Sequence, residues 1–323
     1  MAKLVDPWWD AHRRHLTSRP SPEGLSALAT AVAPTSTVHR VRRLGGGLGS
    51  ATHAITLHKR NGATFDVVLK RFKADADPRD EWARLRYATR LDVPTPSPVA
   101  FDRRGDWFGT PAIVTHRIAG RPTLDPSDID GWLEQIAMTA LTINAASTHR
   151  LPAAVRTPVT IRKLPKGLPP SELADRAVAA VQRYSRTALR ERHVVSHRDF
   201  HPGNLLWSRS KVSGVVDLAY LSLAPEFFDV AYCRIEIAVL HGLRAADRFI
   251  AIVEAHLGRR IDHLPIWDVM RGLTALRWSH FWVIAYREQG ATWLTESNAH
   301  ARVRAFLRRA LASVDAQAEA RAG

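Results

Sequence analysis

The sequence is poor in cysteine and has no long apolar run. Its single cysteine, Cys233, excludes an intrachain disulfide and a metal site built from several thiolates. No apolar run approaches the roughly 20 residues that a membrane-spanning helix needs, and residues 1–7 lack the apolar core of a signal peptide. We therefore expect a cytoplasmic protein without a membrane partner.

Lysine is also scarce and accounts for only seven of the 46 basic residues, although the net charge is +15. Such a charge is typical of proteins that bind nucleic acid, membrane surfaces or nucleotides. Arginine is, however, spread along the whole chain together with abundant alanine, as compositional bias predicts, and no basic tail or arginine-rich block stands out. We therefore expect no specific nucleic-acid partner.

One polar turn lies between two apolar segments in the stretch Val194–Trp207. It contains Asp199 and Asn204 with four residues between them, and a second apolar run ends in Asp217, thirteen residues after Asn204. Phosphoryl transfer of the kinase type uses one carboxylate to orient the attacking hydroxyl, and an amide and a second carboxylate to hold the metal. The spacing therefore predicts a kinase that acts on small molecules.

The N-terminal third of the chain predicts an antiparallel sheet. Alternating apolar residues indicate strands at 38–44, 51–58 and 65–72, and Asn61-Gly62 is a strong hairpin signal because both residues tolerate positive φ. Two more strands are expected at 99–102 and 111–116. Helices are expected at 23–32, before the sheet, and from Asp77 to about Leu91, after the third strand.

A glycine-rich segment joins the first two strands and contains Gly45, Gly46, Gly47, Gly49 and Ser50. Glycines at such a turn let backbone amides approach phosphate oxygens closely. A flexible turn without a ligand is the alternative interpretation, and the pattern G-x-G-x-x-G of protein kinases is not met, because Ser50 stands at its last glycine.

Lys70 is one of the few lysines and lies inside an apolar strand. A charge in such a place is costly unless it is paired. Kinases keep a phosphate-binding lysine on the third strand, whereas the alternative is a strand-end lysine that reaches solvent. Glu81 is the best candidate partner, and Asp77 and Asp80 are its competitors.

The remainder of the chain predicts mainly helices, at residues 128–147, 171–191, 226–241, 245–257, 266–288 and 296–314, with a proline-rich loop at 150–169. In the first of these helices, the side chains expected to pack in the core are Trp132, Ile136, Met138 and Leu141. Together with the strands this gives an α+β fold class.

With these features in order, the chain resembles the aminoglycoside phosphotransferase and choline kinase-like branch of the protein-kinase-like fold. His-Arg-Asp-Phe-His-Pro-Gly-Asn at 197–204 is similar to its H-x-D-x-H-P-G-N signature, Val212–Asp217 to its metal-binding strand, and Asp229 to its structural aspartate. The resemblance covers roughly residues 40–240.

The resemblance implies a bilobal protein. Residues 1–117, with a helical extension at 1–37, would form the N-terminal nucleotide-binding lobe, a five-stranded antiparallel sheet with one main helix. Residues 118–323 would form a helical lobe that carries the catalytic loop and the acceptor site. A monomer or a homodimer is expected.

The resemblance also implies roles for individual residues. Asp199 is the catalytic base, and Asn204 and Asp217 hold Mg²⁺. The phosphates of ATP, or of another nucleoside triphosphate, are expected to contact Lys70, held by Glu81, and the loop residues Gly45, Gly46, Gly47, Gly49 and Ser50. The second ligand is a small hydroxylated acceptor.

Several departures from the sequence patterns of kinases narrow the class of acceptor. The segment Ala224-Pro225-Glu226 follows Asp217 by only seven residues, which leaves no room for the activation segment of a protein kinase. Arg198 replaces the small residue common in this branch. The acids of the helical lobe are scattered, as at Glu226, Glu236 and Glu254, which lowers the expectation of a polycationic aminoglycoside. A sugar, an amino alcohol or a related metabolite fits as well.

Two alternatives remain open. The first is a non-catalytic kinase-like protein that binds nucleotide or ligand. The second is a metal cluster of His197, Asp199 and His201, which Pro202-Gly203 disfavours because they break the helix that would bring the two histidines together.

Overall fold

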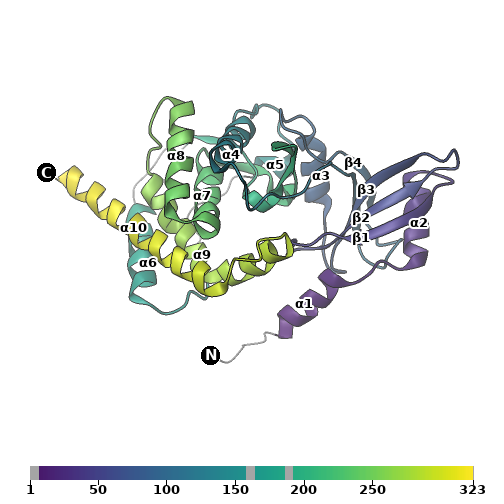
Figure 1. The fold of residues 1–323 in the computed structure, drawn as a ribbon, viewed down its shortest axis with the longest axis horizontal. Helices are drawn as coiled ribbons and strands as arrows, with labels where there is room; N and C mark the ends of the chain where they lie inside the picture. The colour runs from purple at the N-terminus through teal and green to yellow at the C-terminus, as the bar shows by residue number, and fades with distance from the viewer. Residues whose placement is uncertain (1–6, 158–163, 186–191, 323) are drawn as a thin grey trace. The chain divides into compact units, whose positions relative to one another are not determined.

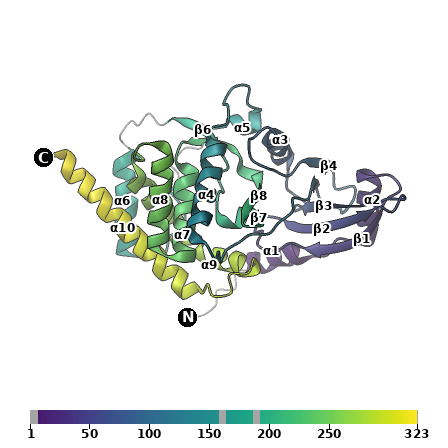
Figure 2. The same ribbon diagram turned by 45° about the horizontal axis from the view of Figure 1, so that its top comes forward.

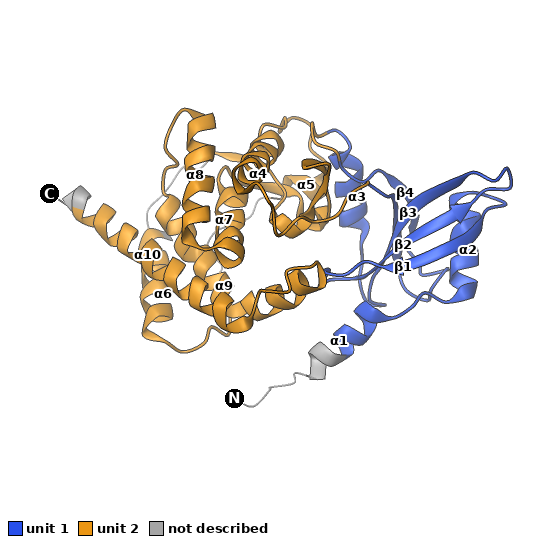
Figure 3. Ribbon diagram, viewed as in Figure 1, with its two compact units in different colours: residues 1–90, 95–118 blue, residues 91–94, 119–323 orange. Residues whose placement is uncertain are grey.

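The computed structural model of the protein describes residues 7–157, 164–185 and 192–322. The chain forms two compact units (Figure 3). The first unit contains residues 1–90 and 95–118, and the second contains residues 91–94 and 119–323.

The first unit is a five-stranded antiparallel sheet with three helices. In chain order these elements are α1 (Pro7–Thr17), α2 (Pro22–Val32), β1 (Thr37–Arg43), β2 (Ala51–His58), β3 (Thr64–Arg71), α3 (Arg79–Ala88), β4 (Pro98–Asp102) and β5 (Ala112–His116). The strand order is β1-β2-β3-β5-β4. Figure 2 shows β1, β2 and β3 of this sheet next to one another. All five predicted strands are confirmed to within one residue, and the α+β fold class is confirmed.

The alternation along β3 separates the core from the polar side of the sheet. Val67 and Leu69 are fully buried and pack with Leu28 of α2. Lys70 follows Leu69 in the strand, so its side chain lies on the opposite face of the sheet. A lysine in this strand is therefore tolerated because the period of two turns its side chain away from the α2 core.

Helix α1 lies within the helical extension expected at 1–37, but the sequence did not predict it as an individual helix. Its segment is mostly polar, with two arginines and two histidines in the helix, so apolar periodicity gives little signal. The next helix, α2, begins where expected, because the side chain of Ser21 accepts the backbone N–H of Gly24 and Pro22 stands at the first helical position.

The second unit is built mainly of helices. They are α4 (Ile129–Asn144), α5 (Ala153–Arg156), α6 (Glu172–Ser185), α7 (Phe228–His241), α8 (Leu243–Leu257), α9 (Leu264–Glu288) and α10 (Glu296–Ala322). Helix α7 is buried along most of its length and packs against α8, α9 and α10 (Figure 1). No helix in the described ranges is both long and apolar enough to cross a membrane.

Four predictions for this unit need correction or completion. Helix α5 interrupts the predicted loop at 150–169, and residues 158–163 of that loop lie outside the described residues. Residues 186–191 of the predicted helix 171–191 also lie outside the described residues. Met138 is 41% exposed and is not a core residue. Helix α10 extends to Ala322 instead of ending at residue 314, because the added turns are rich in strong helix formers.

Four short strands hold the polar turn in place. Of these, the sequence predicted only the run that ends in Asp217. Strand β6 (His193–Ser196) pairs with β9 (Ser222–Pro225), and β7 (Leu205–Ser208) pairs with β8 (Lys211–Val215). Between them lie the short 3₁₀ helices η1 (Pro202–Asn204) and η2 (Leu218–Tyr220). The pairing of Ser196 with Ser222 anchors both ends of the intervening chain.

Candidate functional site

In the first unit, the glycine-rich segment forms the connection between β1 and β2. The backbone N–H of Leu44 donates to the carbonyl of Thr52 at 2.9 Å and closes the base of the loop. Gly46 has φ +92°, a conformation that favours glycine. A side chain at Gly49 would meet nothing within 4 Å, so the tip of the loop is open.

Lys70 and Glu81 are brought together by β3 and α3. Nζ of Lys70 lies 2.6 Å from Oε1 of Glu81, and their side chains are only 19% and 11% exposed. The competing acids are engaged elsewhere, since Asp77 pairs with Arg79 and Asp80 lies 3.9 Å from Arg84. The expected pair is therefore present, while its role toward phosphate stays a prediction.

In the second unit, Asp229 fixes the start of the polar turn. This fully buried carboxylate, in the first turn of α7, accepts the backbone N–H groups of His197 at 2.7 Å and Arg198 at 2.8 Å. Burial raises the pKa of Asp229, whereas the two backbone donors oppose that rise. The loop that leads to Asp199 is thereby held on the end of a buried helix.

His197 connects this loop to the residue before Asp217. Its Nδ1 accepts the backbone N–H of Asp199 at 3.3 Å. Because that nitrogen is an acceptor, Nε2 carries the proton and donates to the carbonyl of Val216 at 2.9 Å. Both ring nitrogens are thus used by the backbone, and His197 has none left for a metal.

Asp199 and Asn204 lie side by side. The amide nitrogen of Asn204 donates to the backbone carbonyl of Asp199 at 2.9 Å and lies 3.4 Å from its Oδ2. The backbone carbonyl of Asn204 accepts the N–H of Val216 at 2.9 Å, so the chain entering Asp217 runs next to Asn204. The three predicted residues of this unit are therefore brought together by the turn and the β7–β8 hairpin.

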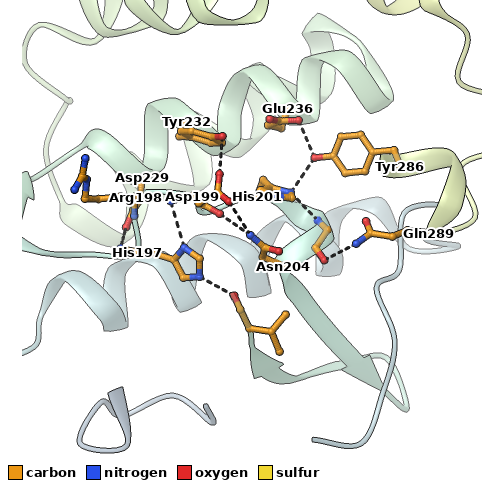
Figure 4. A network of polar contacts seen from close by, with 12 residues as sticks. His197, Arg198, Asp199, His201, Asn204, Asp229, Tyr232, Glu236, Tyr286 and Gln289 are labelled. Atoms are coloured by element: carbon orange, nitrogen blue, oxygen red, sulfur yellow. Dashed lines mark hydrogen bonds and ion pairs between the residues drawn. The ribbon is translucent and has the colours of Figure 1, made fainter. Parts of the chain in front are cut away.

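A second group of polar side chains, which the sequence did not reveal, surrounds Asp199 (Figure 4). The hydroxyl of Tyr232, on α7, donates to Oδ1 of Asp199 at 2.7 Å. Burial and the Asp199 charge raise the pKa of Tyr232 well above its ordinary value, so the hydroxyl stays protonated. Tyr232 therefore restrains one oxygen of the carboxylate and leaves Oδ2 toward Asn204.

His201, Tyr286 and Glu236 continue this network (Figure 4). Nδ1 of His201 accepts the backbone N–H of Gly203 and lies 3.2 Å from the Tyr286 hydroxyl, which donates to Glu236 at 2.8 Å. Burial lowers the pKa of His201 and raises the pKa of Glu236 to about 8. Both groups are consequently mainly uncharged at neutral pH.

The sequence held one signal for this network. Glu236 is an acid in the otherwise apolar run 235–240, and such a residue is costly to bury without a partner. No local spacing links Tyr232 to Asp199 or Tyr286 to His201, since the packing of α7 and α9 brings these residues to the loop. On the same helix, Tyr286 is buried, whereas Trp278 is 39% exposed.

The alternative metal cluster is not formed. Among the described residues, no group of three or more His, Cys, Asp or Glu side chains could hold a metal ion. Nε2 of His201 lies 4.0 Å from Oδ2 of Asp199, and His197 is occupied as described. The histidines of the motif therefore position the loop.

Comparison with known proteins places the chain in a family. The phosphotransferase enzyme family matches residues 40–273. The chain therefore belongs to that family, which confirms the predicted enzyme class, a phosphotransferase with an alcohol group as acceptor. No curated protein sequence matches the chain.

Solved structures share the fold. Aminoglycoside phosphotransferase APH(4)-Ia is 15% identical with a TM-score of 0.58, and the match covers 89% of this chain and 99% of that one. Aminoglycoside phosphotransferase APH(3'')-Id from Streptomyces rimosus, in complex with ADP and streptomycin, is 19% identical with a TM-score of 0.55, over 79% and 98% of the two chains. At such identities the likeness establishes the fold.

Proposed function

We propose that the protein is an ATP-dependent kinase that phosphorylates a hydroxyl group of a small molecule. The observation that carries the proposal is the restrained Asp199 carboxylate, with Tyr232 on one oxygen and Asn204 beside the other. A carboxylate oriented in this way, with only the long contact of Asn204 on Oδ2, is what the orientation of an attacking hydroxyl requires.

In the proposed reaction, the acceptor hydroxyl attacks the γ-phosphorus of ATP. A bond forms between the acceptor oxygen and phosphorus, the bond to the bridging oxygen breaks, and ADP leaves with the bonding electrons. The proton of the hydroxyl passes to Asp199, whose Oδ2 is the oxygen not bonded to Tyr232. Positioning supplies most of the rate, because the transition state of phosphoryl transfer is loose.

The residues present fit a magnesium ion. The side-chain nitrogen of Asn204 donates to Asp199, so the side-chain oxygen, Oδ1, remains for a cation. Together with the carboxylate of Asp217 this gives the oxygen ligands that Mg²⁺ prefers, with phosphate and water completing the shell. When bound, the ion would neutralise charge on the phosphates.

The first unit would bind the nucleotide. The glycine loop, with Gly45, Gly46, Gly47 and Gly49 and with Ser50 buried at its end, offers backbone amides, and Lys70 offers a cation that Glu81 holds in place. ADP is bound in the structure of APH(3'')-Id, and ADP is also bound by a variant of APH(4)-Ia. The same proposal includes a cytoplasmic location and a monomer or homodimer. It also includes a division into lobes at 1–117 and 118–323.

The charges of the second unit do not favour a polycationic acceptor. Glu226 lies 3.0 Å from Arg259 and 3.7 Å from Arg192, and Glu254 accepts the backbone N–H of Ile261. Glu236 is mainly protonated at neutral pH because of its raised pKa, about 8. A sugar, an amino alcohol or a related metabolite therefore fits better than the aminoglycosides bound by the solved relatives.

The proposal is tested by incubating the full chain with ATP, Mg²⁺ and a panel of sugars, amino alcohols, hydroxy acids and aminoglycosides, and following phosphorylated product. We expect Asp199→Asn to lower turnover about 10²- to 10⁴-fold, the usual contribution of a general base. Asp262→Ala changes an exposed acid of the same unit and should leave turnover unchanged. Equal turnover by Asp199→Asn and wild type contradicts the proposal, and nucleotide binding without any product supports the non-catalytic alternative.

A further inference from the structure

An arginine without a carboxylate partner lies beside the candidate catalytic loop. The guanidinium carbon of Arg271, on α9, is 3.9 Å from the ring centre of Phe228 and 4.7 Å from that of Tyr232. Within the described parts of the chain, Arg271 makes no hydrogen bond or ion pair, and its Nε is buried without an acceptor. The side chain as a whole is partly exposed, so a ligand can reach it.

Two other arginines shielded from water in the same unit, Arg234 and Arg302, are satisfied, whereas the Nε of Arg277, on the same helix as Arg271, is also buried without an acceptor. Arg234 pairs with Asp268 and Asp247, and Arg302 donates to the carbonyls of Val239 and Leu240. Shielding a cation from water is costly unless a counter-charge or an acceptor compensates. Burial lowers the pKa of Arg271 to about 10, which still leaves the group charged at neutral pH.

One tyrosine ring separates Arg271 from Asp199. The ring of Tyr232 carries the guanidinium on one side, and its hydroxyl donates to Oδ1 of Asp199 at 2.7 Å. Arg198, the residue before Asp199, carries a second guanidinium, whose like charge contributes to lowering the pKa of Arg271 after the larger effect of burial. A molecule that presents its hydroxyl to Asp199 would therefore lie within reach of a cation.

We propose that Arg271 binds an oxyanion of the acceptor, so that the acceptor is a hydroxylated compound that also carries a carboxylate or a phosphate group. Arginine suits this task because its N–H groups bind oxyanions in pairs while its flat faces rest on aromatic rings. This inference rests on the proposed kinase function, and it excludes polycationic acceptors, since their charge would be repelled by Arg271.

The competing explanation is that Arg271 only balances the charges of Asp199 and Asp229. In that case its replacement would affect every acceptor equally. A specific oxyanion site, in contrast, predicts an effect on charged acceptors that their neutral counterparts do not show. Matched pairs of probes distinguish the two explanations.

The experiment is a calorimetric titration of the full chain with gluconate against glucitol, and with glycerol 3-phosphate against glycerol. We expect at least one oxyanion probe to bind about tenfold more tightly than its neutral counterpart, and Arg271→Gln to remove that difference. The two pairs show whether carboxylate or phosphate is preferred. Arg277→Gln is the matched control, because Arg277 lies on the same helix and also stacks on an aromatic ring, that of Trp278.

Arg271→Lys keeps the charge without paired donors and should retain only part of the preference, and thermal unfolding of each variant verifies folding. The inference is overturned if no oxyanion probe binds better than its neutral counterpart, or if Arg271→Gln keeps the preference. It is also overturned if Arg271→Gln weakens ADP binding alone. Failure of the kinase function is distinct, because oxyanion binding would persist while no acceptor is phosphorylated.

Discussion

A single buried carboxylate, Asp229, satisfies two backbone N–H groups of the loop that leads to Asp199. Asp229→Ala leaves both donors without a partner. We expect the free energy of unfolding to fall by about 2–6 kcal/mol, since each unsatisfied buried donor costs roughly 1–3 kcal/mol. Urea unfolding measures the loss, with the exposed Asp262→Ala as control. A change equal to that of the control would show that the loop does not depend on Asp229.

Arg198 illustrates what a residue type alone conveys. The sequence shows an arginine where the resembling branch commonly has a small residue. The structure gives the physical reason for that preference, because position 198 has φ +67°, in the left-handed region that favours glycine. In this protein, two hydrogen bonds accompany the left-handed conformation of Arg198. Its backbone N–H donates to Asp229, and its guanidinium donates to Ser222.

At the scale of elements, helix α1 is attached to the glycine loop. Nε2 of His12 lies 2.5 Å from the carbonyl oxygen of Leu48, inside that loop. Nε2 of His15 lies 3.3 Å from the carbonyl of Arg71, whose guanidinium donates to Ser18 just after the helix. The helix thus joins the proposed phosphate-binding loop to the end of the strand that carries Lys70.

Removing this attachment should loosen the loop. We expect His12→Ala to increase amide hydrogen exchange at residues 46–49 about fivefold, because an average hydrogen bond contributes about 1 kcal/mol. Exchange mass spectrometry checks this, with Arg13→Ala, an exposed change on the same helix, as control. If both variants exchange like wild type, the contact with Leu48 does not restrain the loop.

At the scale of the whole molecule, buried acids make stability depend on pH. Burial raises the pKa of Glu236 to about 8 and that of Asp268 to about 7. A raised pKa in the folded state stabilises the protein below the ordinary pKa of the group, and this contribution is lost as pH rises through the folded value. Both acids therefore predict lower stability toward alkaline pH.

We expect the free energy of unfolding to decrease between about pH 5 and pH 8, by at most about 1.4 kcal/mol per pH unit for each proton. Glu236→Gln removes one of these groups and should flatten the decrease. Urea unfolding at several pH values measures the slope, and Glu254→Gln, a change of a partly exposed acid on α8, serves as control. An unchanged slope in Glu236→Gln would contradict the prediction.

The strands of the first unit were predictable because half-buried strands alternate, and the helices of the second unit because they are long. Helix α1 and the strand pair β6–β9 were not, since a polar helix and strands of four residues carry little periodicity. Their formation depends on partners distant in the sequence, as when Ser196 pairs with Ser222.

By itself, the sequence determined the local chemistry of the candidate site. Asp199 and Asn204 are close because one turn contains both, and Lys70 had to find an acid because a charge in an apolar strand requires one. Only the tertiary structure decided what surrounds Asp199. Tyr232 contacts it directly, Arg271 lies against the Tyr232 ring, and Tyr286 and Glu236 are linked to the loop through His201. The packing of α7 and α9, which leaves no mark in local spacing, brings these side chains together.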